Sequence, residues 1–167
     1  MCVANWSAGT FDGVLPSESL ASWGISHQTV VSGDFTRLFT GTFLSHDPGM
    51  FVRQLIFAAA VIGYFEWRTS TLRTAATFFA IDLVGTLIVL LGVIPFAAAI
   101  PEIGPSDATA ALDVGMSAGG FGLIGAILAS WPHKWLLLGA VVAAIGIKVW
   151  YDLDLIADSA HLICVLI

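Results

Sequence analysis

Residues Gly115 to Ala126 read GMSAGGFGLIGA, and Ala160 to Leu162 read AHL. Each string lies near the start of its own apolar stretch and carries one side chain suited to acyl transfer, Ser117 or His161. A serine hydroxyl becomes an effective nucleophile when a neutral imidazole accepts its proton. If both stretches cross a membrane in the same direction, these two side chains lie at the same depth and can form such a pair.

The composition places the chain in a lipid bilayer. Hydrophobic residues make up 57% of the 167 residues and charged residues 11%, and the mean hydropathy is +0.91. Soluble domains have about 45–50% apolar and about 25% charged residues. The formal charge is −6 and no basic run is present, which excludes nucleic-acid binding. Cys2 and Cys164 lie far apart, so we predict no disulfide framework and no CxxC metal site.

The apolar runs predict an all-α integral membrane protein with five visible spans. These spans are expected at residues 50–66, 74–100, 114–131, 135–151 and 155–167. The last one is too short to cross the bilayer, and the chain is expected to be truncated at both ends. We predict a single transmembrane domain over 1–167, with an N-terminal outer segment at 1–36 and an outer loop at 37–49.

The charges between the spans set the expected orientation. Arg68, Arg73 and Lys134 fall in two of the connections, whereas seven carboxylates fall in the others. The positive-inside rule places the basic connections in the cytoplasm. Ser117 and His161 then both begin inward-running spans, so the site is expected to face the outside of a plasma or inner membrane.

The small residues and the one acid inside the spans lead to two further predictions. The glycines and alanines of the 114–131 span would let neighbouring helices approach closely. Asp82 falls near the middle of the 74–100 span, where an ionised carboxylate is costly and commonly functional. Because no second intramembrane acid or base suggests a proton path, we favour a protonated or hydrogen-bonded structural role for Asp82.

These strings resemble those of a known family. GMSAGGFGLIGA is similar to the G-x-S-G-x-x-F-G-L-x-G-A string of rhomboid intramembrane proteases, and AHL is similar to the histidine string on that family's last core helix. Upstream, residues 37–66 resemble the rhomboid first loop and second helix. The resemblance covers about 130 residues. It implies a rhomboid-like six-helix transmembrane bundle, of which about five spans are visible here.

The resemblance also implies roles for single residues. Ser117 matches the nucleophile and His161 the general base of a catalytic dyad, and Phe121 matches the aromatic position that packs against the histidine. Arg37 matches an arginine that ties down the outer loop, and an interfacial cation near lipid phosphate explains it equally well. Glu66 matches a carboxylate at the inner end of the second helix, where a structural role is expected.

The residues expected to support an oxyanion depart from the family pattern. Met50 and Gln54 stand where the family has histidine and asparagine as hydrogen-bond donors. Methionine cannot donate a hydrogen bond, whereas glutamine can. Gly115 keeps the family's glycine two residues before the serine, but Ala118 replaces the glycine after it and adds a methyl group where a backbone N–H should face the oxyanion.

Bulky residues also stand at expected contacts of the last helix. Cys164 and Ile156 occupy positions that are often glycine in the family, and their bulk is expected to widen the Ser117–His161 distance and slow catalysis. Two functions therefore stay open. One is a rhomboid-type serine endopeptidase that cleaves transmembrane substrates without a cofactor. The other is a catalytically inactive relative that binds transmembrane helices as an accessory subunit of a larger membrane complex; transport has little support.

Overall fold

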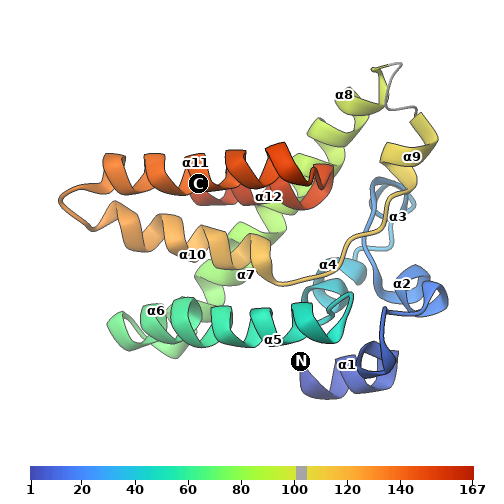
Figure 1. The fold of residues 1–167 in the computed structure, drawn as a ribbon, viewed down its shortest axis with the longest axis horizontal. Helices are drawn as coiled ribbons and strands as arrows, with labels where there is room; N and C mark the ends of the chain where they lie inside the picture. Colours follow the sequence, from blue (N-terminus) through green and yellow to red (C-terminus); the bar gives the residue numbers. More distant parts are fainter. Residues whose placement is uncertain (101–104) are drawn as a thin grey trace. The chain divides into compact units, whose positions relative to one another are not determined.

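The computed structural model describes residues 1–100 and 105–167, and its regular secondary structure there is helical (Figure 1). Within this part of the chain, three helices are long and apolar enough to cross a membrane. They cover Pro48–Arg68, Thr71–Ala98 and Lys134–Tyr151. The prediction of an all-helical chain is confirmed, and the three apolar helices indicate association with a membrane.

The three long helices correspond to the predicted spans at 50–66, 74–100 and 135–151, with ends that differ by up to three residues. Two of them contain a turn of π-helix. The segments are α5 (Pro48–Phe57), η3 (Ala58–Ile62), α6 (Gly63–Arg68), α7 (Thr71–Ile88), η4 (Val89–Val93), α8 (Ile94–Ala98) and α11 (Lys134–Tyr151). The side chain of Ser70 caps α7 by accepting a hydrogen bond from the N–H of Arg73, which fixes where this helix begins.

Of the other two predicted spans, the one at 114–131 is shorter than expected, whereas the one at 155–167 has about the short length that was predicted. α10 covers Ser117–Ala129 and α12 covers Leu155–Leu166, which are 13 and 12 residues, whereas about 20 are needed to cross the hydrocarbon core. The helix predicted over 114–131 begins at residue 117 because Gly115 has a φ of 136° and donates its N–H to the carbonyl of Gly41 at 2.9 Å. A positive φ is incompatible with a right-handed helix and favours glycine.

The chain divides into two compact units. Unit 1 comprises residues 1–57 and 90–116, and unit 2 comprises residues 58–89 and 117–167. Two of the boundaries fall at the π-helical turns of the long helices. Each unit has its own packing, and each holds a different group of the residues that the sequence singles out.

Unit 1 consists mainly of short helices. Besides α5 and α8 they are α1 (Cys2–Ala8), η1 (Thr10–Asp12), α2 (Ser17–Trp23), α3 (His27–Val31), α4 (Arg37–Thr40), η2 (Gly41–Phe43) and α9 (Pro105–Ala110). The stretches 1–36 and 37–49, predicted as an N-terminal outer segment and an outer loop, thus contain several short helical turns. Leu15, Leu44 and Val114 form a small apolar core. Beside it, buried Asn5 donates to the carbonyl of Phe43 at 2.8 Å, so this buried amide is paired.

Unit 2 packs α10 against both α7 and α12, and α10, α11 and α12 run side by side in Figure 1. Glycines make the approach possible. A Cβ atom at Gly125 would lie 2.3 Å from the carbonyl oxygen of Val165 on α12, and one at Gly122 would lie 2.3 Å from Cγ2 of Ile81 on α7. The predicted close approach of helices along this glycine-rich segment is therefore confirmed.

The contact between α7 and α12 depends on a third glycine. A Cβ atom at Gly85 would lie 2.1 Å from Sγ of Cys164, whose side chain is fully buried. We expect Gly85→Ala to destabilise the protein by about 1–3 kcal/mol, because the added methyl group overpacks this contact. Thermal unfolding in detergent measures the loss.

Two further variants sharpen this test. Cys164→Ala removes the clashing sulfur, so the Gly85→Ala/Cys164→Ala double variant should unfold at a higher temperature than Gly85→Ala alone. Gly139→Ala is the matched control, because a Cβ atom there meets nothing within 4 Å. Losses that simply add in the double variant would contradict a direct Gly85–Cys164 contact.

Candidate active site

Unit 2 brings the two predicted reactive side chains together. Oγ of Ser117 lies 2.7 Å from Nε2 of His161, within hydrogen-bond distance. Ser117 is the first residue of α10, and His161 lies in the second turn of α12. In the tautomer that carries its proton on Nδ1, the imidazole offers Nε2 as an acceptor for the serine hydroxyl. The pair therefore has the geometry of a nucleophile and its base.

An aromatic ring fixes the orientation of the imidazole. Phe121 lies one turn after Ser117 on α10, and its ring centroid is 4.2 Å from that of His161 with an interplanar angle of 24°. Stacking at this distance restricts rotation of the imidazole about its side-chain bonds. It is the contact that the family resemblance implies for residue 121.

The expected widening of the dyad by bulky residues is not observed. Cys164 directs its sulfur toward Gly85 of α7, where the absence of a side chain provides the space. Ile156 is buried in the first turn of α12. The expectation was wrong because the extra volume at position 164 is accommodated at the α7–α12 contact, so Ser117 and His161 stay at 2.7 Å.

The buried carboxylate of Asp82 supports the start of the serine helix. Its Oδ1 accepts a hydrogen bond of 2.9 Å from the backbone N–H of Gly119. Gly119 is the third residue of α10, and the first four N–H groups of a helix have no partner inside that helix. The prediction of a hydrogen-bonded structural Asp82 is confirmed. Asp82 thus positions the turn that carries Ser117.

An ion pair near the dyad was not predicted. Nζ of Lys148 on α11 lies 3.0 Å from Oδ2 of Asp158 on α12, and the two side chains are 44% and 4% exposed. The backbone N–H of Asp154 donates to the same oxygen at 2.9 Å. Oδ1 of Asp158 is buried without a hydrogen-bond partner among the described residues. The available signal was a lysine inside an apolar span, which calls for a partner.

A cavity of about 400 Å³ opens beside the imidazole, between α10, α11 and α12. Its walls are mainly apolar side chains such as Ile124, Val141 and Ile145, and the Lys148–Asp158 pair lines it as well. The cavity can therefore accept an apolar group next to His161.

Unit 1 holds three of the residues predicted to support an oxyanion, Met50, Gln54 and Gly115. Gln54 is buried, and its Oε1 accepts a hydrogen bond of 2.7 Å from the hydroxyl of Ser45. Its Nε2 has no hydrogen-bond partner among the described residues. A Cβ atom at Gly115 would lie 2.8 Å from this nitrogen. Because an unpaired buried donor is costly, an amide group held in this way is suited to bind an acceptor.

Met50 lies beside Gly115 as well. Its sulfur accepts the backbone N–H of His46 at 3.3 Å, and its Cε would lie 3.0 Å from a Cβ atom at Gly115. The thioether brings no donor to this place. Ala118, the other departure from the family pattern, is buried in the first turn of α10. Of these side chains only Gln54 offers a free N–H group.

Arg37 ties together segments of unit 1. Its Nε donates to Oδ2 of Asp34 at 2.6 Å, and its Nη1 donates to the carbonyls of Ala21 and Gly24 at the end of α2. Hydrogen bonds from Thr36 and Arg37 lower the pKa of the Asp34 carboxyl. This arrangement favours the loop-bracing interpretation of Arg37 over that of a cation facing lipid.

Glu66 links α6, in which it lies, to the start of α7. Its Oε1 accepts a hydrogen bond of 2.5 Å from the hydroxyl of Thr71, at the start of α7. Glu66 is exposed near the end of α6. Its contact is therefore structural, as the resemblance implies.

No family model, curated protein or solved structure matches this chain. Within residues 1–100 and 105–167, no group of three or more His, Cys, Asp or Glu side chains is placed to hold a metal ion. The functional assignment therefore depends on the chemistry and geometry of the residues themselves.

The role of Asp82 leads to a first test of the site. Asp82→Ala leaves the N–H of Gly119 without its acceptor, which should cost about 1–3 kcal/mol of stability. Asp82→Asn keeps a carbonyl oxygen as acceptor and should cost less. Thermal unfolding in detergent compares both variants with Asp152→Ala, which removes a carboxylate that is 85% exposed. Equal losses for the alanine and asparagine variants would argue against the hydrogen bond.

Proposed function

We propose that this chain is a serine endopeptidase of the rhomboid type, which cleaves transmembrane segments of other membrane proteins. The observation that carries the proposal is the 2.7 Å contact between Ser117 Oγ and His161 Nε2. The stacked ring of Phe121 and the apolar cavity beside the imidazole support it. The three apolar helices are consistent with a reaction that takes place in a membrane.

The dyad can carry both halves of peptide hydrolysis. In the first half, Oγ of Ser117 attacks the substrate carbonyl carbon while the hydroxyl proton passes to Nε2 of His161. The tetrahedral intermediate then collapses, the C–N bond breaks, and the imidazolium gives its proton to the leaving amine. In the second half, His161 deprotonates a water molecule, which attacks the acyl-enzyme. The acyl C–Oγ bond then breaks, and the imidazolium returns its proton to Oγ of Ser117. The products are a carboxylic acid and the free serine hydroxyl, and no cofactor takes part.

The oxyanion of the tetrahedral intermediate needs hydrogen-bond donors. The resemblance assigns this role to residues 50 and 54, and Gln54 has an amide NH₂ group that no described residue pairs. Met50 cannot donate. Loss of one oxyanion donor typically costs about 2.7–4 kcal/mol of transition-state stabilisation, or 10²–10³ in rate. We therefore propose an enzyme slower than one with both donors.

The proposal includes the rhomboid-like six-helix bundle and an active-site end that faces the outside of a plasma or inner membrane. Its support is the packing of α10 against α7 and α12. A second support is the charge pattern, in which Arg68, Arg73 and Lys134 lie at one set of helix ends. The substrate would present an apolar side chain to the cavity beside His161.

Met50 favours a second function. A relative that has lost one oxyanion donor can keep the same bundle and bind transmembrane helices without cutting them. Such a protein would act as an accessory subunit of a larger membrane complex. The two functions differ in one chemical property, because only the peptidase requires Ser117 to be an activated nucleophile.

Labelling with a fluorophosphonate tests that property. The serine oxygen attacks phosphorus and fluoride leaves, so the reaction needs a nucleophile and a base but no peptide substrate. We expect the purified full chain in detergent to be labelled, and we expect both Ser117→Ala and His161→Ala to abolish the labelling. Ser130→Ala removes an exposed serine hydroxyl and should leave it unchanged. Absence of labelling in folded wild-type protein would favour the helix-binding function.

The role of Gln54 has a separate test. Gln54→Ala removes the free amide and should lower the rate constant for cleavage of a transmembrane substrate by about 10²–10³, with a smaller change in KM. The variant also removes the acceptor of the Ser45 hydroxyl, so its thermal unfolding must be measured beside its activity. Gln28→Ala is the control for the loss of a glutamine side chain from α3. An unchanged rate in folded Gln54→Ala would exclude Gln54 as an oxyanion donor.

A further inference from the structure

Three basic residues of unit 2 lie where apolar helices begin or end. Arg68 is the last residue of one candidate membrane span, Arg73 is the third residue of the next, and Lys134 is the first residue of another. These three are half of the six Lys and Arg residues in the chain. The ends of membrane helices lie at the level of the lipid headgroups, where basic side chains meet phosphate.

Two of these cations share one hollow. Arg68 and Arg73 line a cavity of about 280 Å³ next to the C-terminal end of α10, together with Tyr64 and Trp131. Nη1 of Arg68 donates to the hydroxyl of Tyr64 at 3.2 Å, and the guanidinium lies 5.9 Å from the tyrosine ring centroid. In the part of the chain that the structure describes, neither guanidinium forms an ion pair with a carboxylate. The hollow thus contains two positive charges that are not neutralised.

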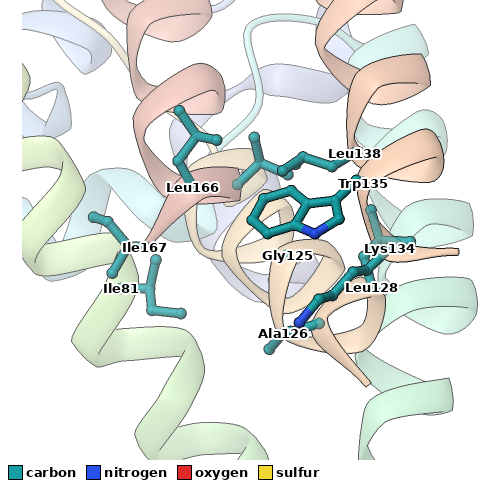
Figure 2. A pocket seen from close by; sticks show the side chains of 11 residues that line it. Ile81, Gly125, Ala126, Leu128, Lys134, Trp135, Leu138, Leu166 and Ile167 are labelled. Atoms are coloured by element: carbon teal, nitrogen blue, oxygen red, sulfur yellow. The ribbon is translucent and has the colours of Figure 1, made fainter. Parts of the chain in front are cut away.

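A second hollow, of about 220 Å³, lies beside the same end of α10 (Figure 2). Figure 2 shows Lys134, Trp135 and Leu138 of α11 on one side of this hollow. Leu166, at the end of α12, lies on the other side. Nζ of Lys134 lies 5.5 Å from the centroid of the Trp135 ring. A lysine beside a tryptophan above apolar walls is typical of the boundary between headgroups and acyl chains. The residues around both hollows are therefore of the kinds expected at a lipid interface.

We propose that the cavity between Arg68 and Arg73 binds the headgroup phosphate of an anionic phospholipid. The planar guanidinium groups match the geometry of phosphate oxygens, and both arginines line this cavity. The volume is close to the lower end of the roughly 300–1,000 Å³ of small-molecule pockets, which suits a headgroup and not a whole lipid. The acyl chains of this lipid would lie along the apolar surface of the membrane helices. This site is independent of Ser117 and His161.

One nearby carboxylate could compete with a phosphate for the two arginines, but it has another partner. Glu66 is the acid closest in sequence to both arginines, and it accepts the hydroxyl of Thr71. The whole chain has a charge of −6, so attraction to an anionic lipid is a property of this end of unit 2 and not of the protein as a whole.

Native mass spectrometry of the purified full chain tests the proposal with two lipids that differ in headgroup charge, phosphatidylglycerol and phosphatidylcholine with identical acyl chains. We expect wild-type protein to retain one phosphatidylglycerol in preference to phosphatidylcholine. Loss of two interfacial charges should reduce that preference by about 30-fold in Arg68→Gln/Arg73→Gln. Arg53→Gln removes one exposed arginine from α5 and should leave the preference unchanged.

Three results would overturn the proposal. One is equal retention of the two lipids by the wild-type chain. Another is a loss of preference in Arg53→Gln as large as in the double variant, which would show an effect of overall charge. The third comes from thermal unfolding in detergent. If inorganic phosphate alone stabilises the wild type as much as phosphatidylglycerol does, and does not stabilise the double variant, the hollow is a phosphate site and not a lipid site.

Discussion

The close approach of α10 and α12 at Gly125 is the contact on which the dyad depends. The missing side chain lets the backbone of Val165 come so near that a Cβ atom at Gly125 would lie 2.3 Å from its carbonyl oxygen. A second contact between the same helices is the Ser117–His161 hydrogen bond. These two contacts lie at different positions along the helix axes, so together they prevent α10 and α12 from sliding or rotating relative to each other. The serine and the histidine are therefore held in register by packing as well as by their own hydrogen bond.

Such packing has a cost that the surroundings of α10 offset. Its thirteen residues include four glycines, each of which lowers helix stability by about 1 kcal/mol relative to alanine in water. In a membrane, no water competes for the backbone N–H and C=O groups, so the helical hydrogen bonds are retained. Asp82 completes the arrangement by accepting the N–H of Gly119 in the first turn. The residues that weaken α10 as an isolated helix are those that let it pack.

The sequence was informative where function depends on local strings and less so where it depends on pairing between distant residues. The apolar runs predict the helical class. The lack of a second acid or base that would suggest a proton path favours a protonated or hydrogen-bonded structural Asp82. The positions of Ser117 and His161 follow from two short strings. The short length of α10 was missed, because the positive φ of Gly115 depends on its hydrogen bond to Gly41. The Lys148–Asp158 pair and the space that Gly85 provides also arise only when separate helices meet.

The place of His161 in the chain has a consequence for biogenesis. Ser117 and His161 are 44 residues apart in sequence, and α11 lies between their helices. During synthesis α10 is made before α11, and α12 leaves the ribosome only after both. Until α12 has been made, the serine hydroxyl lacks the imidazole of His161, which accepts its proton. Under the proposed peptidase function, Ser117 therefore becomes an activated nucleophile only after synthesis has passed α12.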